Sequence, residues 1–276
     1  MKKLTWILAA SALALAACGG EEADTGTTEG GEASKDIKLG ATAGPYSDML
    51  NEAIVPALEE KGYTVETIEF SDYIQPNNAL NNGEIDANLF QHTVYLENFE
   101  TENDMDLSAL ITVPTAPMGI YSNEFDSLDA VSDGATIAIP NDPVNGARAL
   151  LMLQDEGLVE LDPEAEVLQA SERDVTENPK NLVFQPIEAG QLPRAVEGTD
   201  LAAVPGNFAL AADMDLLDAL ALENMPDQYR NVVAVAAKNE DSELAADLVE
   251  IVESEEFETV IDEQFEGFGK PEWMAE

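Results

Sequence analysis

Residues 135–148 read ATIAIPNDPVNGAR and decide the fold class, because they join a buried strand directly to the start of a helix. Residues 135–139 are small, apolar or β-branched, which is typical of a strand covered on both faces. Asp142 then stands at the helix N-cap and Pro143 at the first helical position, where these residue types are favoured. We expect this helix to end at Gly157. A strand followed at once by a helix is typical of α/β proteins.

The same alternation of short strands and amphipathic helices continues on both sides of this segment. The other expected strands are residues 37–41, 64–70, 85–90, 182–187, 201–204 and 232–237. The other expected helices are residues 47–61, 93–102, 241–253 and 255–264. Because a second strand–helix series begins near residue 125, we expect two α/β lobes. The expected crossovers between them are residues 111–122 and 224–231, which would return the C-terminal helices to the first lobe.

The first residues have the features of an export signal. Lys2 and Lys3 precede an apolar stretch, residues 4–15, that is too short for a comfortable membrane span. The stretch ends in Leu15-Ala16-Ala17-Cys18, which resembles the bacterial lipobox. We therefore expect a signal peptide over residues 1–17 and a lipid anchor on Cys18. The alternative is an ordinary signal peptide with an incidental cysteine.

Residues 18–36 are rich in Gly, Glu, Ser and Thr, a composition that cannot bury a core and that predicts a flexible, lipidated tether. Cys18 is the only cysteine in the chain, so we expect no disulfide in the mature protein. The expected location is the cell envelope, with the protein held to a membrane by its lipid and facing the periplasm or the exterior.

The charge balance is strongly acidic, with 12 basic against 56 acidic residues and a formal net charge of −44. Such a surface repels nucleic acid and anionic lipid, so we expect no nucleic-acid partner. We interpret the acidity as an adaptation for solubility. The alternative, a cation-binding surface, lacks a compact ligand pattern such as an EF-hand loop, and we expect neither a metal site nor a cofactor.

Five segments of the chain resemble one known family. They are FSDYIQPN (70–77), GEIDANLFQH (83–92), PNDPVNGAR (140–148), ENPKNL (177–182) and QLPR (191–194). In this order and behind a lipobox, they resemble the methionine-binding lipoproteins of bacterial transporters (NlpA/MetQ-like), from about residue 37 onward. The resemblance implies an α/β, two-lobed periplasmic-binding-protein fold (type II-like) with the ligand in a cleft between the lobes. The implied lobes are residues 37–115 plus 230–276, and residues 116–229.

The implied ligand is a small amino acid, most specifically methionine, and the implied partner is an ABC permease in the membrane. A zwitterion needs a cation for its carboxylate, and Arg148 is our candidate, because a guanidinium can grip a carboxylate with two parallel hydrogen bonds. Asn145 lies three residues earlier and therefore on the same helix face. The alternatives are a surface ion pair for Arg148 and a helix-capping role for Asn145.

Aromatic residues are the candidates for the pocket around the ligand side chain: Tyr73, Phe90, His92 and Tyr95. Aromatic edges suit a thioether, because sulfur is polarizable and contacts rings favourably. His92 is the only histidine, and no nucleophile motif accompanies it, so we expect a pocket wall or hydrogen-bonding group rather than a catalytic base. A purely structural role for His92 is the alternative.

Asn207 and Asn231 resemble positions where the family presents asparagines to the ligand. The chain departs from the family at Pro205, where many members carry an asparagine, and at Tyr46, where a histidine is common. Proline has no N–H donor and no side-chain acceptor. These departures bear on the identity of the ligand.

We expect binding without turnover, by a monomer whose lobes close on the ligand. An exported hydrolase is the competing class, but the sequence has neither G-x-S-x-G nor H-E-x-x-H. The other alternative keeps the fold and changes the task, to a different amino acid, a short peptide, sensing or adhesion.

Overall fold

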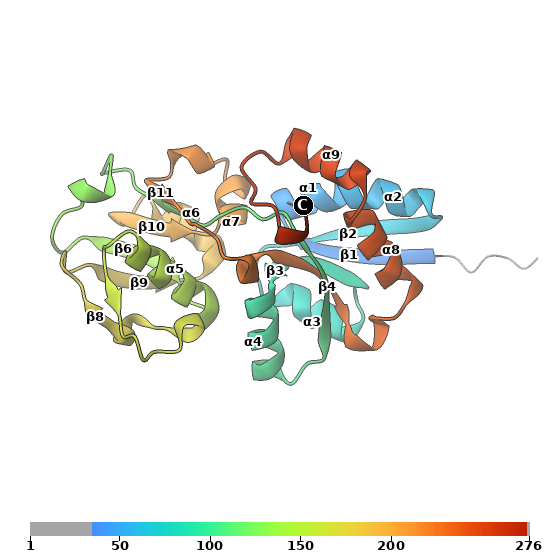
Figure 1. Ribbon diagram of the computed structural model, residues 1–276, viewed down its shortest axis with the longest axis horizontal. Coiled ribbons are helices and arrows are strands. Elements are labelled where there is room, and N and C mark those ends of the chain that lie inside the picture. The colour runs from blue at the N-terminus through green and yellow to red at the C-terminus, as the bar shows by residue number, and fades with distance from the viewer. Residues whose placement is uncertain (1–34, 275–276) are drawn as a thin grey trace, which may run out of the picture. The chain divides into compact units, whose positions relative to one another are not determined.

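The computed structural model describes residues 35–274, which form two five-stranded sheets and a small two-stranded one (Figure 1). The expected signal peptide, Cys18 and nearly all of the expected tether lie outside these residues. We call residues 35–113 together with 231–274 the first half, and residues 119–222 the second half, because each contains one of the large sheets.

The first half has a sheet of order β2-β1-β3-β12-β4. Its strands are β1 (Lys35–Thr42), β2 (Tyr63–Phe70), β3 (Ala87–His92), β4 (Leu107–Val113) and β12 (Asn231–Ala236). Its α-helices are α1 (Pro45–Met49), α2 (Val55–Glu60), α3 (Gln75–Asn82), α4 (Thr93–Asn103), α8 (Glu243–Val252) and α9 (Glu255–Gln264). β1 pairs in parallel with β2 and β3, whereas β12 lies antiparallel between β3 and β4. The C-terminal part of the chain thus completes the sheet that the N-terminal part begins.

The second half has a sheet of order β11-β5-β10-β6-β9. Its strands are β5 (Gly119–Tyr121), β6 (Thr136–Pro140), β9 (Val183–Ile187), β10 (Leu201–Val204) and β11 (Ala221–Leu222). Its α-helices are α5 (Pro143–Asp155), α6 (Leu192–Ala195) and α7 (Gly206–Ala211). The small sheet pairs β7 (Glu160–Leu161) with β8 (Val175–Glu177). β6 pairs in parallel with β9 and β10, while β5 is antiparallel to β10 and β11.

The strand-to-helix joint that decided the fold class is confirmed. Asp142 caps α5, because its carboxylate accepts the N–H of Asn145 at 2.8 Å, and Pro143 occupies the first helical turn. α5 ends at Asp155, and Gly157 adopts a positive φ of 71° just beyond it. The residue types at both ends therefore fix this helix where the sequence predicts it.

Several expectations differ from the structure. Residues 111–122 were expected to be a crossover, but they contain the end of β4 and all of β5, so the first connection is only residues 114–118. The expected strand 85–90 lies two residues later, as β3. α3 was not expected, because its sequence QPNNALNN has few apolar residues. The second connection, residues 223–230, agrees with the expected crossover.

The expected helix over residues 47–61 is interrupted by a wider π-helical turn at Leu50–Ile54. Pro56 follows directly, and proline has no N–H with which to continue the α-helical ladder. α1, this turn and α2 nevertheless bury one continuous set of side chains, including Met49, Ile54 and Leu58, each fully or almost fully buried. The helix therefore covers the sheet despite the irregular turn.

Each half has its own hydrophobic core. In the first half, Leu39 of β1 and Val235 of β12 share a cluster with Leu248 and Phe257 from α8 and α9. The expectation that the C-terminal helices pack on the first lobe is confirmed. In the second half, strands β5, β6 and β10 pack against α5 in a separate cluster. Within residues 35–274, no helix has the length and apolarity needed to cross a membrane.

Gly157 gives a test of the helix end. We expect Gly157→Ala to lower the free energy of unfolding by about 1–2 kcal/mol, because an alanine is strained at positive φ. The cost is purely conformational, since no heavy atom lies within 4 Å of an added Cβ. Gly198→Ala is the matched control, because its φ is not in the left-handed region and its Cβ meets only Ala195 O at 3.9 Å. Urea unfolding of both variants checks this, and equal stabilities would contradict it.

Candidate functional site

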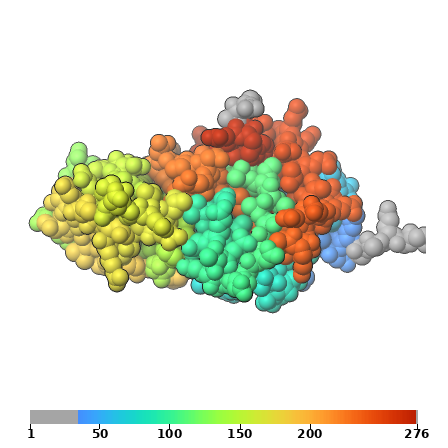
Figure 2. All heavy atoms as spheres, turned by 60° about the horizontal axis from the view of Figure 1, so that its bottom comes forward, coloured from blue at the N-terminus to red at the C-terminus, as the bar shows by residue number. Residues whose placement is uncertain are grey.

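One pocket is lined by residues from both halves. All eight residues predicted to bind the ligand line it: Tyr73, Phe90, His92, Tyr95, Asn145, Arg148, Asn207 and Asn231. The other lining residues are Tyr46, Gln91, Thr115, Ala116, Pro205 and Gly206. On the face seen in Figure 2, teal residues of the first half and yellow residues of the second half abut. The structure thus brings the predicted residues together.

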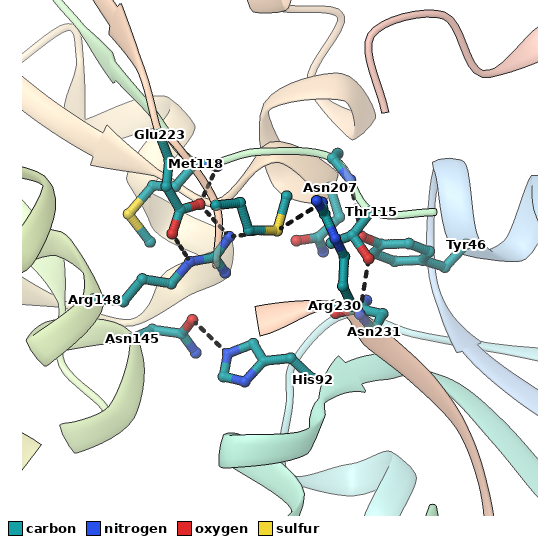
Figure 3. A network of polar contacts seen from close by, with 12 residues as sticks. Tyr46, His92, Thr115, Met118, Asn145, Arg148, Asn207, Glu223, Arg230 and Asn231 are labelled. Atoms are coloured by element: carbon teal, nitrogen blue, oxygen red, sulfur yellow. Dashed lines mark hydrogen bonds and ion pairs between the residues drawn. The ribbon is translucent and has the colours of Figure 1, made fainter. Parts of the chain in front are cut away.

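His92 links the two halves at the floor of this pocket. It ends β3 and caps α4, since its Nδ1 accepts the N–H of Tyr95 at 3.1 Å. The ring proton therefore sits on Nε2, which donates to Asn145 Oδ1 of α5 at 3.2 Å (Figure 3). Burial, together with the positive charge of Arg148, lowers the pKa of His92 to about 3. His92 is consequently a neutral hydrogen-bonding group.

Asn145 is oriented by the residue that begins its helix. Its side-chain amide donates to the carboxylate of Asp142 at 3.2 and 3.3 Å, which leaves its Oδ1 directed at His92. Burial raises the pKa of Asp142, although hydrogen bonds from Asn145 oppose the shift. Asn145 therefore combines the capping arrangement with a place in the pocket wall.

Arg148 is buried in the pocket wall and is already paired. Its Nε donates to Glu223 Oε1 at 2.7 Å and its Nη2 to Glu223 Oε2 at 2.5 Å (Figure 3). The two side chains are only 6% and 7% exposed, so the ion pair considered as an alternative for Arg148 exists but is internal rather than on the surface. Burial disfavours the charge of Arg148, but the Glu223 carboxylate outweighs burial and raises the pKa of Arg148. The guanidinium also lies 5.1 Å from the centroid of the Tyr229 ring.

The aromatic residues form one wall. The ring centroid of Tyr73 lies 5.9 Å from that of Phe90 and 5.7 Å from that of Tyr95. The ring centroids of Phe90 and Tyr95 are 6.2 Å apart. Tyr73 also approaches Phe208 of α7 to 4.9 Å. Edge and tilted contacts of this kind are favourable for aromatic rings. These rings therefore form one aromatic wall of the pocket.

The other two predicted asparagines come from different halves of the molecule. Asn207, in the first turn of α7, accepts the phenol O–H of Tyr73 at 2.7 Å and so joins the halves a second time. Asn231 begins β12, and its backbone N–H donates to Thr115 Oγ1 at 2.7 Å. Both side chains are about 4% exposed.

The two departures from the family both line the pocket. Pro205 is the N-cap residue of α7 and contributes no donor. Tyr46, on α1, accepts the N–H of Ala116 at 3.3 Å, and burial raises its pKa to about 12. A tyrosine here ties the first half to the first connection and occupies more of the pocket than a smaller side chain would.

Several pocket residues escaped the sequence analysis. Gly206 approaches the first connection so closely that a Cβ would lie 2.4 Å from Pro117 O. In the sequence, only its neighbour Pro205 pointed to this part of the pocket. Gln91 exchanges hydrogen bonds of 2.6 and 2.7 Å with buried Asn77. Glu223, which pairs with Arg148 but does not line the pocket, was also missed, because no local sequence feature marks it. Among the described residues, no cluster of three or more His, Cys, Asp or Glu side chains is arranged to hold a metal ion.

Comparison with known proteins agrees with this geometry. The sequence profile of the family described as NlpA lipoprotein matches residues 37–273. The chain is 36% identical over 276 residues to the methionine-binding lipoprotein MetQ of Bacillus subtilis (strain 168), with 97% of each chain covered. It is 34% identical over 264 residues to the D-methionine-binding lipoprotein MetQ of Escherichia coli (strain K12), covering 95% of this chain and 94% of that one.

Solved structures agree as well. A nutrient binding protein from Burkholderia cenocepacia, solved bound to methionine, is 39% identical and superimposes with a TM-score of 0.80 over 84% of this chain and 97% of that one. The expected α/β, two-lobed periplasmic-binding-protein fold is confirmed, as is the family resemblance of the five segments. The chain belongs to the NlpA lipoprotein family.

Proposed function

We propose that this protein binds methionine in the pocket between its halves and delivers it to an ABC importer in the membrane. The observation that carries the proposal is the composition of the pocket, in which one buried guanidinium faces an aromatic wall. Relatives that are named methionine-binding, and a related structure solved with methionine, support the choice of ligand.

The pocket offers a partner for each part of the ligand. The end of the Arg148 guanidinium that Glu223 does not use receives the carboxylate. Side-chain carbonyls of Asn207 and Asn231 accept hydrogen bonds from the ammonium. The thioether side chain packs between Tyr73, Phe90 and Tyr95, because these rings form the apolar side of the pocket.

The mechanism is capture by closure. We propose that residues 37–115 with 230–276 act as one lobe and residues 116–229 as the other. Ligand binding favours the closed form only through contacts that the open form lacks. The hydrogen bonds His92–Asn145 and Tyr73–Asn207 already join the lobes, and a ligand held by Arg148 and the aromatic wall adds to them.

Anchoring and delivery complete the proposal. The signal peptide of residues 1–17 is removed, a lipid on Cys18 holds the protein to the envelope outside the cytoplasm, and residues 18–36 tether the fold. The monomeric, ligand-loaded protein then docks on its permease, which passes the ligand inward with ATP hydrolysed by a partner subunit. The lipoprotein names of the relatives support the anchor.

One observation favours a second candidate, which is the same fold with another amino acid or a short peptide as ligand. Pro205 and Tyr46 change the chemistry of the pocket wall relative to the family pattern. Mass spectrometry of the small molecules released on denaturing the purified protein separates the candidates. Released methionine, with saturable methionine binding after refolding, supports the proposal; a different released compound, or no binding of either methionine isomer, contradicts it.

Arg148→Lys tests the role of the guanidinium while leaving a cation opposite Glu223. We expect methionine affinity to fall by about tenfold or more, because an ammonium cannot hold two carboxylates with the planar fork of arginine. Arg173→Lys, at an exposed position of the same half, is the control and should bind as the wild type does. Calorimetric titration measures both, and equal affinities of the Arg148 and Arg173 variants would reject the assignment.

His92 gives a prediction for the pH dependence of stability. Burial lowers its pKa from 6.5 to about 3, so the unfolded chain takes up a proton below pH 6.5 that the folded chain does not. The stabilising effect of neutral His92 is complete above pH 6.5 and declines by about 1.4 kcal/mol per pH unit as the pH falls toward 3.

Comparison with His92→Gln isolates this dependence, because the many carboxylates titrate in both proteins. We expect the free energy of unfolding of the wild type to fall faster than that of His92→Gln between pH 6.5 and pH 4.5. Urea unfolding at several pH values measures the two slopes. Parallel slopes would show that His92 takes up a proton in the folded protein.

A further inference from the structure

Glu223 is built into the site although it does not line the pocket. It begins the second connection, residues 223–230, and its carboxylate is hydrogen-bonded from two directions. Oε1 and Oε2 accept from Nε and Nη2 of Arg148, and Oε2 also accepts the backbone N–H of Met118 at 3.2 Å. Met118 lies at the end of the first connection. Glu223 therefore links the Arg148 guanidinium to both connections between the halves, residues 114–118 and 223–230 (Figure 3).

The pairing leaves one end of the guanidinium for a ligand. Arginine has five N–H donors, and Glu223 uses those of the Nε–Nη2 edge. Within residues 35–274, Nη1 makes no hydrogen bond, while Nη2 has one further contact, with the sulfur of Met225 at 3.7 Å. Arg148 lines the pocket and Glu223 does not. We therefore infer that the N–H groups of Arg148 that Glu223 does not use lie on the side of the guanidinium that faces the pocket. A ligand carboxylate at that end shares the guanidinium with Glu223.

Because Glu223 and the ligand carboxylate share the Arg148 guanidinium, the net charge of the ligand affects how well it binds. Arg148 and Glu223 are together neutral, Arg230 in the same network is balanced by Asp227 at 3.7 Å, and His92 is uncharged near neutral pH. The nearby carboxylate of Asp142 is hydrogen-bonded to Asn145 and not to Arg148. A zwitterion adds no net charge to this set, whereas a carboxylic acid without an ammonium adds a second buried anion next to Glu223, which is unfavourable.

We propose that Glu223 is a positioning and specificity-determining residue, which orients Arg148 and makes the pocket select an amino acid zwitterion over the corresponding carboxylic acid without the ammonium. The inference rests on the proposed function, because it assumes that a ligand carboxylate meets Arg148. A purely structural role for Glu223 would weaken the binding of both kinds of ligand equally.

The test compares two ligands of nearly equal shape, L-methionine and its hydroxy analogue, in which a hydroxyl replaces the ammonium. Calorimetric titration of the whole mature protein gives the ratio of their affinities. We expect the wild type to prefer methionine by about a hundredfold or more, and Glu223→Gln to reduce this ratio by about tenfold or more, because the amide keeps the shape and removes the negative charge.

Two control variants sharpen the comparison. Glu223→Asp keeps the charge and should retain the selectivity within about threefold. Glu240→Gln removes one negative charge at an exposed site, where Glu240 accepts only from Ser108 Oγ at 2.7 Å, and should match the wild type. An unchanged ratio in Glu223→Gln, with both affinities lowered alike, overturns the inference.

The wild type alone supplies a check that does not depend on the folding of any variant. If it binds the hydroxy analogue within about twofold of methionine, the inference is wrong while the proposed function stands. If it binds neither ligand, the proposed function fails first, and the inference falls with it.

Discussion

A buried guanidinium needs a buried counter-charge, and the pair of Arg148 and Glu223 meets this requirement at the centre of the molecule. Removing one partner from such a pair costs about 3–5 kcal/mol, because the other is left charged and poorly solvated. The pair draws together α5, the end of the first connection and the start of the second. Both connections between the halves are therefore tied to the Arg148 side chain.

The contacts between the halves are of two kinds. Most core side chains belong to a cluster within one half, so each half has its own core. Across the boundary lie a few hydrogen bonds and the aromatic side chains of the first half, such as Phe90 and Tyr95 beside Val144. Boundaries that are small and partly polar permit relative motion of domains.

Much of the fold and of the site could be read from the sequence. Residues 135–157 carry their own start and stop residues, so β6 and α5 were located closely. Five of the eight predicted residues, Tyr73, Phe90, His92, Asn145 and Arg148, lie in the segments that resemble a known family, and all eight line one pocket. Their roles toward a ligand stay predictions.

The remainder depends on contacts between distant residues. β4 alternates only weakly, and it becomes a strand because β12, more than a hundred residues later, pairs with it. Glu223 is one of 56 acidic residues and lies 75 positions from Arg148, so local pattern gives no reason to choose it. Only the folded chain shows which carboxylate neutralises the guanidinium.

The placement of β12 between β3 and β4 also governs the order in which the molecule is completed. A chain made from its N-terminus has every strand of the second sheet by residue 222, while the first sheet lacks an inner strand until residue 236. Pairing over such long separations is slow. The half that begins first is thus the last to be completed.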